Sequence, residues 1–103
     1  MRDIKIYKVI KSSIADTVEK GQVVLDEVTC GLSLKDKVIL DFGNIERVTH
    51  EFAYTALGML LCSFSYKEIK ENLEIINIDD LSALTCAAAL TEATKDFLMT
   101  GGN

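Results

Sequence analysis

His50 is the only histidine of the chain, and two carboxylates near it in sequence could share acid-base chemistry with it, Asp41 and Glu51. A histidine at a helix start should be mostly neutral, so His50 could act as a base or a phosphoacceptor. Catalysis needs further partners, and no Ser/His/Asp or Cys/His set can be assembled from this spacing. Carboxylates beside a helix start are also what the helix dipole favours. We therefore predict no enzymatic activity, with His50 a capping or surface residue.

Thr49 is the stronger functional candidate, because it directly precedes an apolar run with helical spacing. Its hydroxyl can cap that helix. A kinase could also phosphorylate it, and the phosphate would meet free backbone N–H groups at the helix start. Two interpretations stay open: a cap alone, or a cap that is also a regulatory phosphoacceptor. We predict a partner-binding surface made of Asn44, Arg47, Thr49, His50, Glu51 and Tyr54.

Composition describes an ordinary globular chain of 103 residues with 49% hydrophobic and 26% charged residues. The net charge of −5 argues against a nucleic-acid interface, which needs a Lys/Arg stripe to neutralise phosphates. It also disfavours docking on an anionic membrane. No apolar run approaches the length that spans a bilayer, and the N-terminus lacks the apolar region of a signal peptide. We expect a cytoplasmic protein.

Cysteine usage points the same way. Cys30, Cys62 and Cys86 are odd in number, widely separated and set in apolar helical stretches. With no Cys-x-x-Cys motif and one histidine, we predict neither a disulfide framework nor a metal site, and no cofactor. We expect all three to be buried thiols in a reducing compartment.

One stretch, 37–61, organises the rest of the chain. It opens with Val38–Leu40, a short β-branched run that is typical of a parallel strand buried on both faces. Asp41 ends this run, and Gly43 and Asn44 break it. A helix of about 15 residues should follow Thr49. Its predicted inner face consists of Phe52, Ala53, Ala56, Leu57, Leu60 and Leu61.

Three further segments complete the pattern. Alternation predicts a strand over 3–11, and Asp16 with Glu19 resembles a capping pair that starts a first helix. Gly21 lies on the inner face of that helix, which indicates close approach to another backbone. After a polar segment, 63–72, a third strand is predicted over 73–78. Asp79 and Asp80 can cap a last helix that runs to about residue 98 and lies close on the sheet through its alanines.

This order predicts a single α/β domain spanning 1–103, of the form βαβαβα. Strands that alternate with helices imply a mostly parallel sheet, with helices packed on it. In such open sheets, sites lie beyond the carboxyl ends of the strands. Here that edge holds residues 41–50 and 77–80.

The run Val38-Ile39-Leu40-Asp41-Phe42, followed by Ile45, Val48, Thr49, Phe52 and Gly58, resembles the STAS-like domains of unknown function, DUF4325. That family is distantly similar to anti-sigma factor antagonist domains. The resemblance extends from the helix at Gly21 to the strand at Ile75–Asn77.

Proteins of the STAS type bind partners, often histidine-kinase-like ATPases that phosphorylate a Ser or Thr at this helix start. The resemblance therefore implies a non-enzymatic regulatory module that binds a protein, here through residues 44–54. One departure matters: the family commonly shows Thr-Ser-Ser-Phe, whereas this chain has Thr49-His50-Glu51-Phe52. Thr49 is then the remaining acceptor, and Glu51 could hold a permanent charge in place of a phosphate. The alternative is a module that senses a small molecule or nucleotide in the same strand-end crevice.

Overall fold

Helices and strands are interspersed through residues 1–101, the part of the chain that the computed structural model describes; side chains are described through residue 97. The elements in chain order are β1 (Arg2–Lys5), α1 (Ile6–Ile10), β2 (Ile14–Ala15), α2 (Val18–Ser33), β3 (Val38–Asp41), β4 (Arg47–Val48), α3 (His50–Ala56), the 3-10 helix η1 (Gly58–Cys62), α4 (Tyr66–Asn72), β5 (Leu73–Ile76) and α5 (Asp80–Gly101). This is the α/β class that the alternation predicts.

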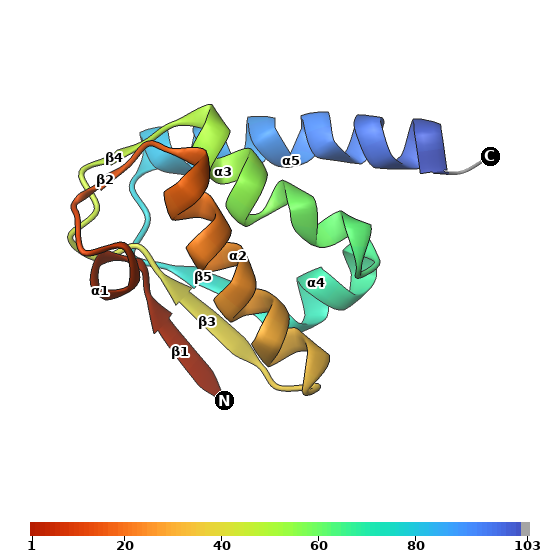
Figure 1. Ribbon diagram of the computed structural model, residues 1–103, viewed down its shortest axis with the longest axis horizontal. Coiled ribbons are helices and arrows are strands. Elements are labelled where there is room, and N and C mark those ends of the chain that lie inside the picture. The colour runs from red at the N-terminus through yellow and green to blue at the C-terminus, as the bar shows by residue number, and fades with distance from the viewer. Residues whose placement is uncertain (102–103) are drawn as a thin grey trace.

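The main sheet has three parallel strands in the order β1-β3-β5 (Figure 1). Its register aligns Ile4 with Leu40 and Leu40 with Ile75. Ile4, Val38 and Leu40 are all buried, because α2 packs on β1 and β3 while α4 packs on β5. The prediction of a parallel sheet with the run at Val38–Leu40 as its central strand is confirmed.

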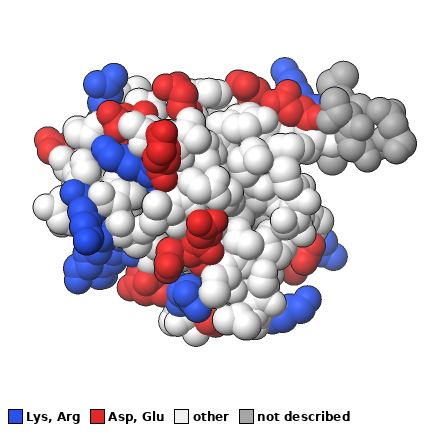
Figure 2. All heavy atoms as spheres, viewed as in Figure 1, with Lys and Arg blue, Asp and Glu red and all other residues white. Residues whose placement is uncertain are grey.

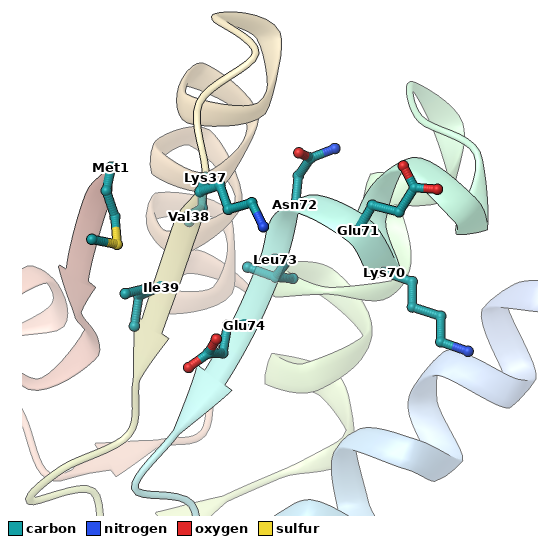
Figure 3. A pocket seen from close by; sticks show the side chains of 9 residues that line it. All are labelled: Met1, Lys37, Val38, Ile39, Lys70, Glu71, Asn72, Leu73 and Glu74. Atoms are coloured by element: carbon teal, nitrogen blue, oxygen red, sulfur yellow. The ribbon is translucent and has the colours of Figure 1, made fainter.

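The opposite face of this sheet is not covered by the described helices. Asp3, Lys5 and Glu74 are exposed there, and Ile39 is only half-buried. Figure 3 shows Ile39 and Glu74 side by side on neighbouring strands. The prediction that β3 is buried on both faces is therefore wrong, because the helices pack on one side of the sheet.

Close packing of α2 against α3 confirms the prediction made for Gly21. A Cβ atom placed there would lie 3.0 Å from the Phe52 carbonyl oxygen and 2.8 Å from Cβ of Thr55. Hydrogen in place of a side chain is what lets the two helices approach. The predicted inner residues of the second helix, Phe52, Ala53, Ala56, Leu57 and Leu60, are all buried, whereas Leu61 is half-buried.

The long last helix, α5, packs on α3, η1 and β4 rather than directly on the sheet. Its buried residues are Ser82, Cys86, Ala89 and Ala93. Asp79 caps it, since the Asp79 carboxylate accepts from the Ser82 amide at 2.7 Å. Figure 1 shows the far end of α5 projecting past the other helices.

The segment 3–11 differs most from expectation. The strand ends at Lys5, and Ile6–Ile10 form the helix α1. Ile4 and Ile6 have the spacing of a strand, but Ile6, Val9 and Ile10 have that of a helix, and the two patterns overlap at Ile6. Lys11 then ends α1 in the left-handed conformation, at φ 56°.

Two other expectations are corrected. The polar segment 63–72 contains the helix α4, which starts with a capping box between Ser65 and Glu68. That Ser-x-x-Glu spacing is visible in the sequence and marks the helix start. Of the three cysteines expected to be buried, only Cys86 is; Cys30 and Cys62 are exposed.

Candidate functional site

Asp41 is the last residue of β3. It pairs with Lys5 and Ile76, the last residues of the two neighbouring strands. One carboxylate oxygen, Oδ1, accepts from the Gly43 amide at 2.8 Å and from Nδ2 of Asn77 at 3.0 Å. The other, Oδ2, lies 3.7 Å from Nζ of Lys5. Side-chain and backbone hydrogen bonds, from Asn77 first and Gly43 second, hold the pKa of Asp41 below its usual value. Asp41 thus links the end of β3 to the following loop and to Asn77 after β5.

Replacing Asp41 with asparagine should lower the free energy of unfolding by about 1 kcal/mol at pH 7, because charge-assisted hydrogen bonds are weakened. Since the folded-state pKa lies below the unfolded one, near 3.9, this stabilisation is complete above that pH and is lost as pH falls through the folded-state value. Urea unfolding of both proteins between neutral pH and about pH 2 measures it. A difference that does not shrink with acidification would contradict the assignment.

The loop after Asp41 is held by a second, two-stranded parallel sheet that the sequence did not reveal. In this sheet β2 pairs with β4, aligning Ile14 with Arg47. The Glu46 amide donates to the Ser13 carbonyl at 2.8 Å, and the Thr49 amide donates to that of Ala15 at 3.0 Å. The loop is therefore fixed on both sides of β4, while the Glu46 and Arg47 side chains are exposed.

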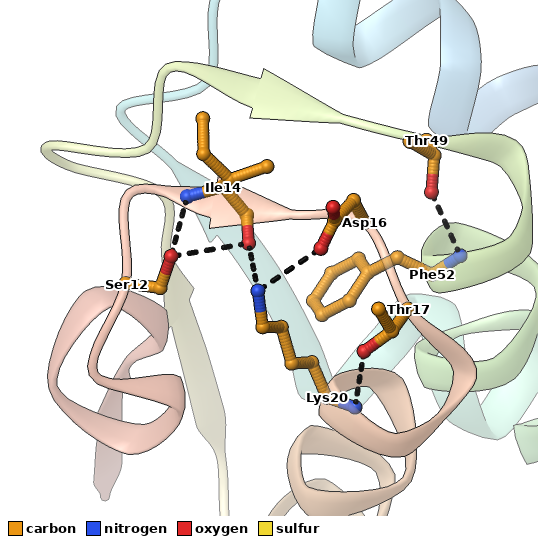
Figure 4. A network of polar contacts seen from close by, with 7 residues as sticks. All are labelled: Ser12, Ile14, Asp16, Thr17, Lys20, Thr49 and Phe52. Carbon is orange, nitrogen blue, oxygen red and sulfur yellow. Dashed lines mark hydrogen bonds and ion pairs between the residues drawn. The ribbon is translucent and has the colours of Figure 1, made fainter.

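Lys20 connects α2 to this second sheet. Its ammonium donates to the Ile14 carbonyl and to Asp16 Oδ1, both at 3.0 Å, and Figure 4 shows it reaching from α2 to β2. The residue that caps α2 is Thr17, one position after the predicted Asp16. Thr17 accepts from the Lys20 amide and caps the helix, while Asp16 binds the Lys20 side chain instead.

Thr49 caps α3, as predicted: its Oγ1 accepts from the Phe52 amide at 3.3 Å (Figure 4). The residue is half-buried. Asn44, in the left-handed conformation at φ 65°, lies exposed earlier in the loop. A shallow hollow of about 510 Å³ opens beside it at the strand ends, lined by Tyr7, Ser13, Asn44 and Glu46.

His50 and Tyr54 turn toward α5 and are bound within the chain. His50 Nε2 lies 2.8 Å from Glu92 Oε2, and the Tyr54 hydroxyl donates to Asp96 Oδ2 at 2.6 Å. The hydrogen bond to Asp96, followed by burial, raises the pKa of Tyr54 to about 12. The acid that contacts His50 is thus Glu92, rather than Asp41 or Glu51. These two contacts hold α5 against α3.

Tyr54 follows His50 by four residues on α3, and Asp96 follows Glu92 by four residues on α5. The two helices therefore run side by side in the same direction. Leu81, Ala88 and Glu92 share one stripe of α5, being seven and then four residues apart. Glu92 contacts His50 of α3, and α5 also packs on β4.

Two leucines in the first two turns of α5 are unusually exposed. Leu81 is 76% and Leu84 is 68% exposed. We define the docking surface as these leucines together with exposed Arg47 and Glu51. Sequence reasoning missed both leucines, although apolar residues that fall outside the inner face of a helix could have indicated them.

Figure 2 shows basic side chains gathered around β1 and α1, without a continuous basic stripe across the face in view. Among the described residues, no group of three or more His, Cys, Asp or Glu side chains is arranged to hold a metal ion. None of the described helices is both long and apolar enough to cross a membrane.

Residues 20–83 match the family model described as "STAS-like domain of unknown function (DUF4325)". No curated protein and no solved structure was found to match the chain. The matched region runs from α2 to the first turn of α5 and includes β3, the loop and α3. Because it covers more than half of the 103 residues, the chain belongs to the STAS-like DUF4325 family.

Proposed function

We propose that this protein is a non-enzymatic regulatory module of the cytoplasm that binds a protein partner through residues 44–54 and the neighbouring turns of α5. The proposed partner is an ATPase of the histidine-kinase-like type, as for the STAS proteins that the sequence resembles. The observation that carries the proposal is the pair of exposed leucines, Leu81 and Leu84, on α5, the helix that packs on β4 and α3, where Arg47 and Glu51 are exposed.

Leucines exposed singly are normal on protein surfaces. Leu81 and Leu84 are three residues apart, so they are neighbours on α5 and together offer apolar area that a partner could bury. Burying them would supply most of the binding energy, at roughly 25 cal/mol for each Å² of apolar surface. Arg47, Glu51 and Asn44 would then set the register with the partner through charge and hydrogen bonding.

His50 and Tyr54 support this surface rather than contact the partner directly. Their bonds to Glu92 and Asp96 fix α5 against α3. Because the parts of the docking surface on α3 and on α5 are already held together before binding, less conformational entropy is lost when a partner binds.

Thr49 is the proposed phosphoacceptor. Its hydroxyl is engaged in the cap, so phosphorylation requires the first turn of α3 to open, after which phosphate oxygens could accept from the freed Phe52 amide. Glu51 beside it would repel the added charge. A phosphate at Thr49 should therefore weaken the docked state and act as a switch.

Binding assays with purified candidate ATPases test the proposal. Replacing both Leu81 and Leu84 with aspartate should weaken binding at least roughly tenfold, because two apolar anchors become charged. The matched control is Leu34→Asp, since Leu34 is 66% exposed but lies at the far end of α2. Equal affinities for the double variant and the wild type would move the interface elsewhere. Mass spectrometry of the same mixtures with ATP shows whether Thr49 gains a phosphate.

A nucleotide-sensing role in the strand-end hollow is the alternative, and its lining supports it less. The residues around it include the acid Glu46 but no base, so the hollow offers no cation for a phosphate. A saturating nucleotide should raise the unfolding midpoint, with about 2.7 kcal/mol of stabilisation at 100 times its dissociation constant. An unchanged midpoint with every nucleotide tried would eliminate this role.

A further inference from the structure

A small apolar cavity lies under the opposite side of α5 from the docking surface. Its volume is about 150 Å³, and it sits between η1, α4, β5 and α5. The apolar lining comes from Leu57, Leu60, Ile69, Leu73, Ile75 and Leu90. Leu57, Leu60 and Ile69 are buried, whereas Leu73, Ile75 and Leu90 are only half-buried, so the cavity has an apolar floor and an opening to solvent.

This space opens to solvent, so it is a surface pocket rather than an enclosed void, and its lining is mostly apolar. An apolar cavity of about 150 Å³ is large enough to hold benzene in another protein, and it stays dry when empty. Water entering here would find few hydrogen-bond partners. The floor therefore suits an apolar group of about six carbon atoms.

A positively charged side chain, that of Lys70, lies at the opening of the cavity. Tyr66 and Lys70 also line the cavity and lie four residues apart on α4, so both belong to the side of that helix that carries Ile69. Lys70 is exposed, and Figure 3 shows its side chain leaving α4 in the direction of α5. Among the described residues, no carboxylate forms an ion pair with it, in contrast to Lys5 and Lys20.

We propose that this cavity binds a small monocarboxylate whose apolar body, aromatic or branched, fills the space between η1 and α5 while its carboxylate pairs with Lys70. Leu60 and Leu90 would contact the body, and Tyr66 also lines the cavity. The site shares no residue with the docking surface, so a test of this proposal does not depend on whether the proposed protein partner binds.

Benzoate is the probe, titrated into protein with labelled leucine and isoleucine methyl groups and followed by NMR. Methyl signals of Leu60, Ile75 and Leu90 should move in a saturable way with benzoate. They should move less with benzyl alcohol or benzylammonium, which match its size but not its charge. Lys70→Gln should weaken benzoate binding roughly fivefold, as expected for a partly exposed ion pair. The matched control, Lys67→Gln, makes the same charge change on the same helix and should leave the affinity unchanged.

A filled cavity provides the second test. Leu90→Phe should abolish the benzoate-induced shifts, and Ile75→Phe serves the same purpose if the first variant unfolds. Three results would overturn the proposal: no saturable shift with benzoate, equal binding of the three probes, or equal loss of affinity in the Lys67 and Lys70 variants. A filled variant that is folded yet still binds benzoate would also overturn it.

Discussion

Replacing Phe52 with alanine should lower the free energy of unfolding by about 3–5 kcal/mol, the usual range for removing a buried aromatic ring. Phe52 is 1% exposed and is the largest of the fully buried side chains. It lies in the first turn of α3, three residues after the Thr49 cap. A domain of this size has about 5–15 kcal/mol of stability in total, so this one change should remove a large fraction of it.

Urea unfolding monitored by circular dichroism measures the effect, and Glu51→Ala is the matched control one residue away. Glu51 is exposed, so its replacement should change stability by no more than about 0.5 kcal/mol. A loss below about 1 kcal/mol for Phe52→Ala would mean that the first turn of α3 is not packed as described. It would then also remove the rigid support that the docking surface requires.

Replacing Gly21 with alanine should destabilise the protein by about 1–3 kcal/mol, the cost of overpacking a tight interface. In an isolated helix the same change would stabilise by about 1 kcal/mol. The sign reverses here because the new methyl group would meet the Phe52 carbonyl oxygen at 3.0 Å. That oxygen is backbone and cannot swing aside, so α2 and α3 must separate.

Val23→Ala is the control for Gly21→Ala. Val23 lies in the same helix but is 46% exposed, so alanine there should raise helix propensity without a clash. The two variants should therefore move the urea midpoint in opposite directions. A stabilised Gly21→Ala protein would show that α2 and α3 are not in close contact, and would remove the reason for a glycine inside α2.

These variants also bear on the proposed function. Gly21 and Gly58 are both sites of close approach: a Cβ at Gly58 would lie 2.8 Å from Cβ of Ala93. Through these two glycines, α3 packs on α2 and η1 packs on α5. The docking surface crosses from β4 and α3 to α5, so its shape depends on this packing as well as on the bonds of His50 and Tyr54.

The sequence by itself was sufficient for features set by neighbouring residues. The β-branched run at Val38–Leu40, the Thr49 cap and the inner face of α3 all depend on local periodicity and hydrogen bonding, and each was predicted correctly. The parallel order of the main strands followed from their alternation with helices. Close approach at Gly21 was also predicted, because a helical glycine on an apolar face has a propensity cost that packing must offset.

Where two local patterns competed, the sequence could not decide. Ile4, Ile6, Val9 and Ile10 fit a strand at one end and a helix at the other, and only the packed structure places the boundary at Lys5. The sequence also could not show that helices cover only one face of the main sheet. An apolar run shows that a strand is buried, but not which helices cover it.

Tertiary structure alone decided the make-up of the candidate site. The Tyr54–Asp96 and His50–Glu92 contacts each join residues 42 positions apart, and residue spacing carries no information about such pairs. The packing of α5, which carries Leu81 and Leu84, on β4 and α3 likewise exists only in the folded chain. Local interactions are encoded by nearby residues, whereas a surface shared by β4, α3 and α5 exists only after the chain has packed.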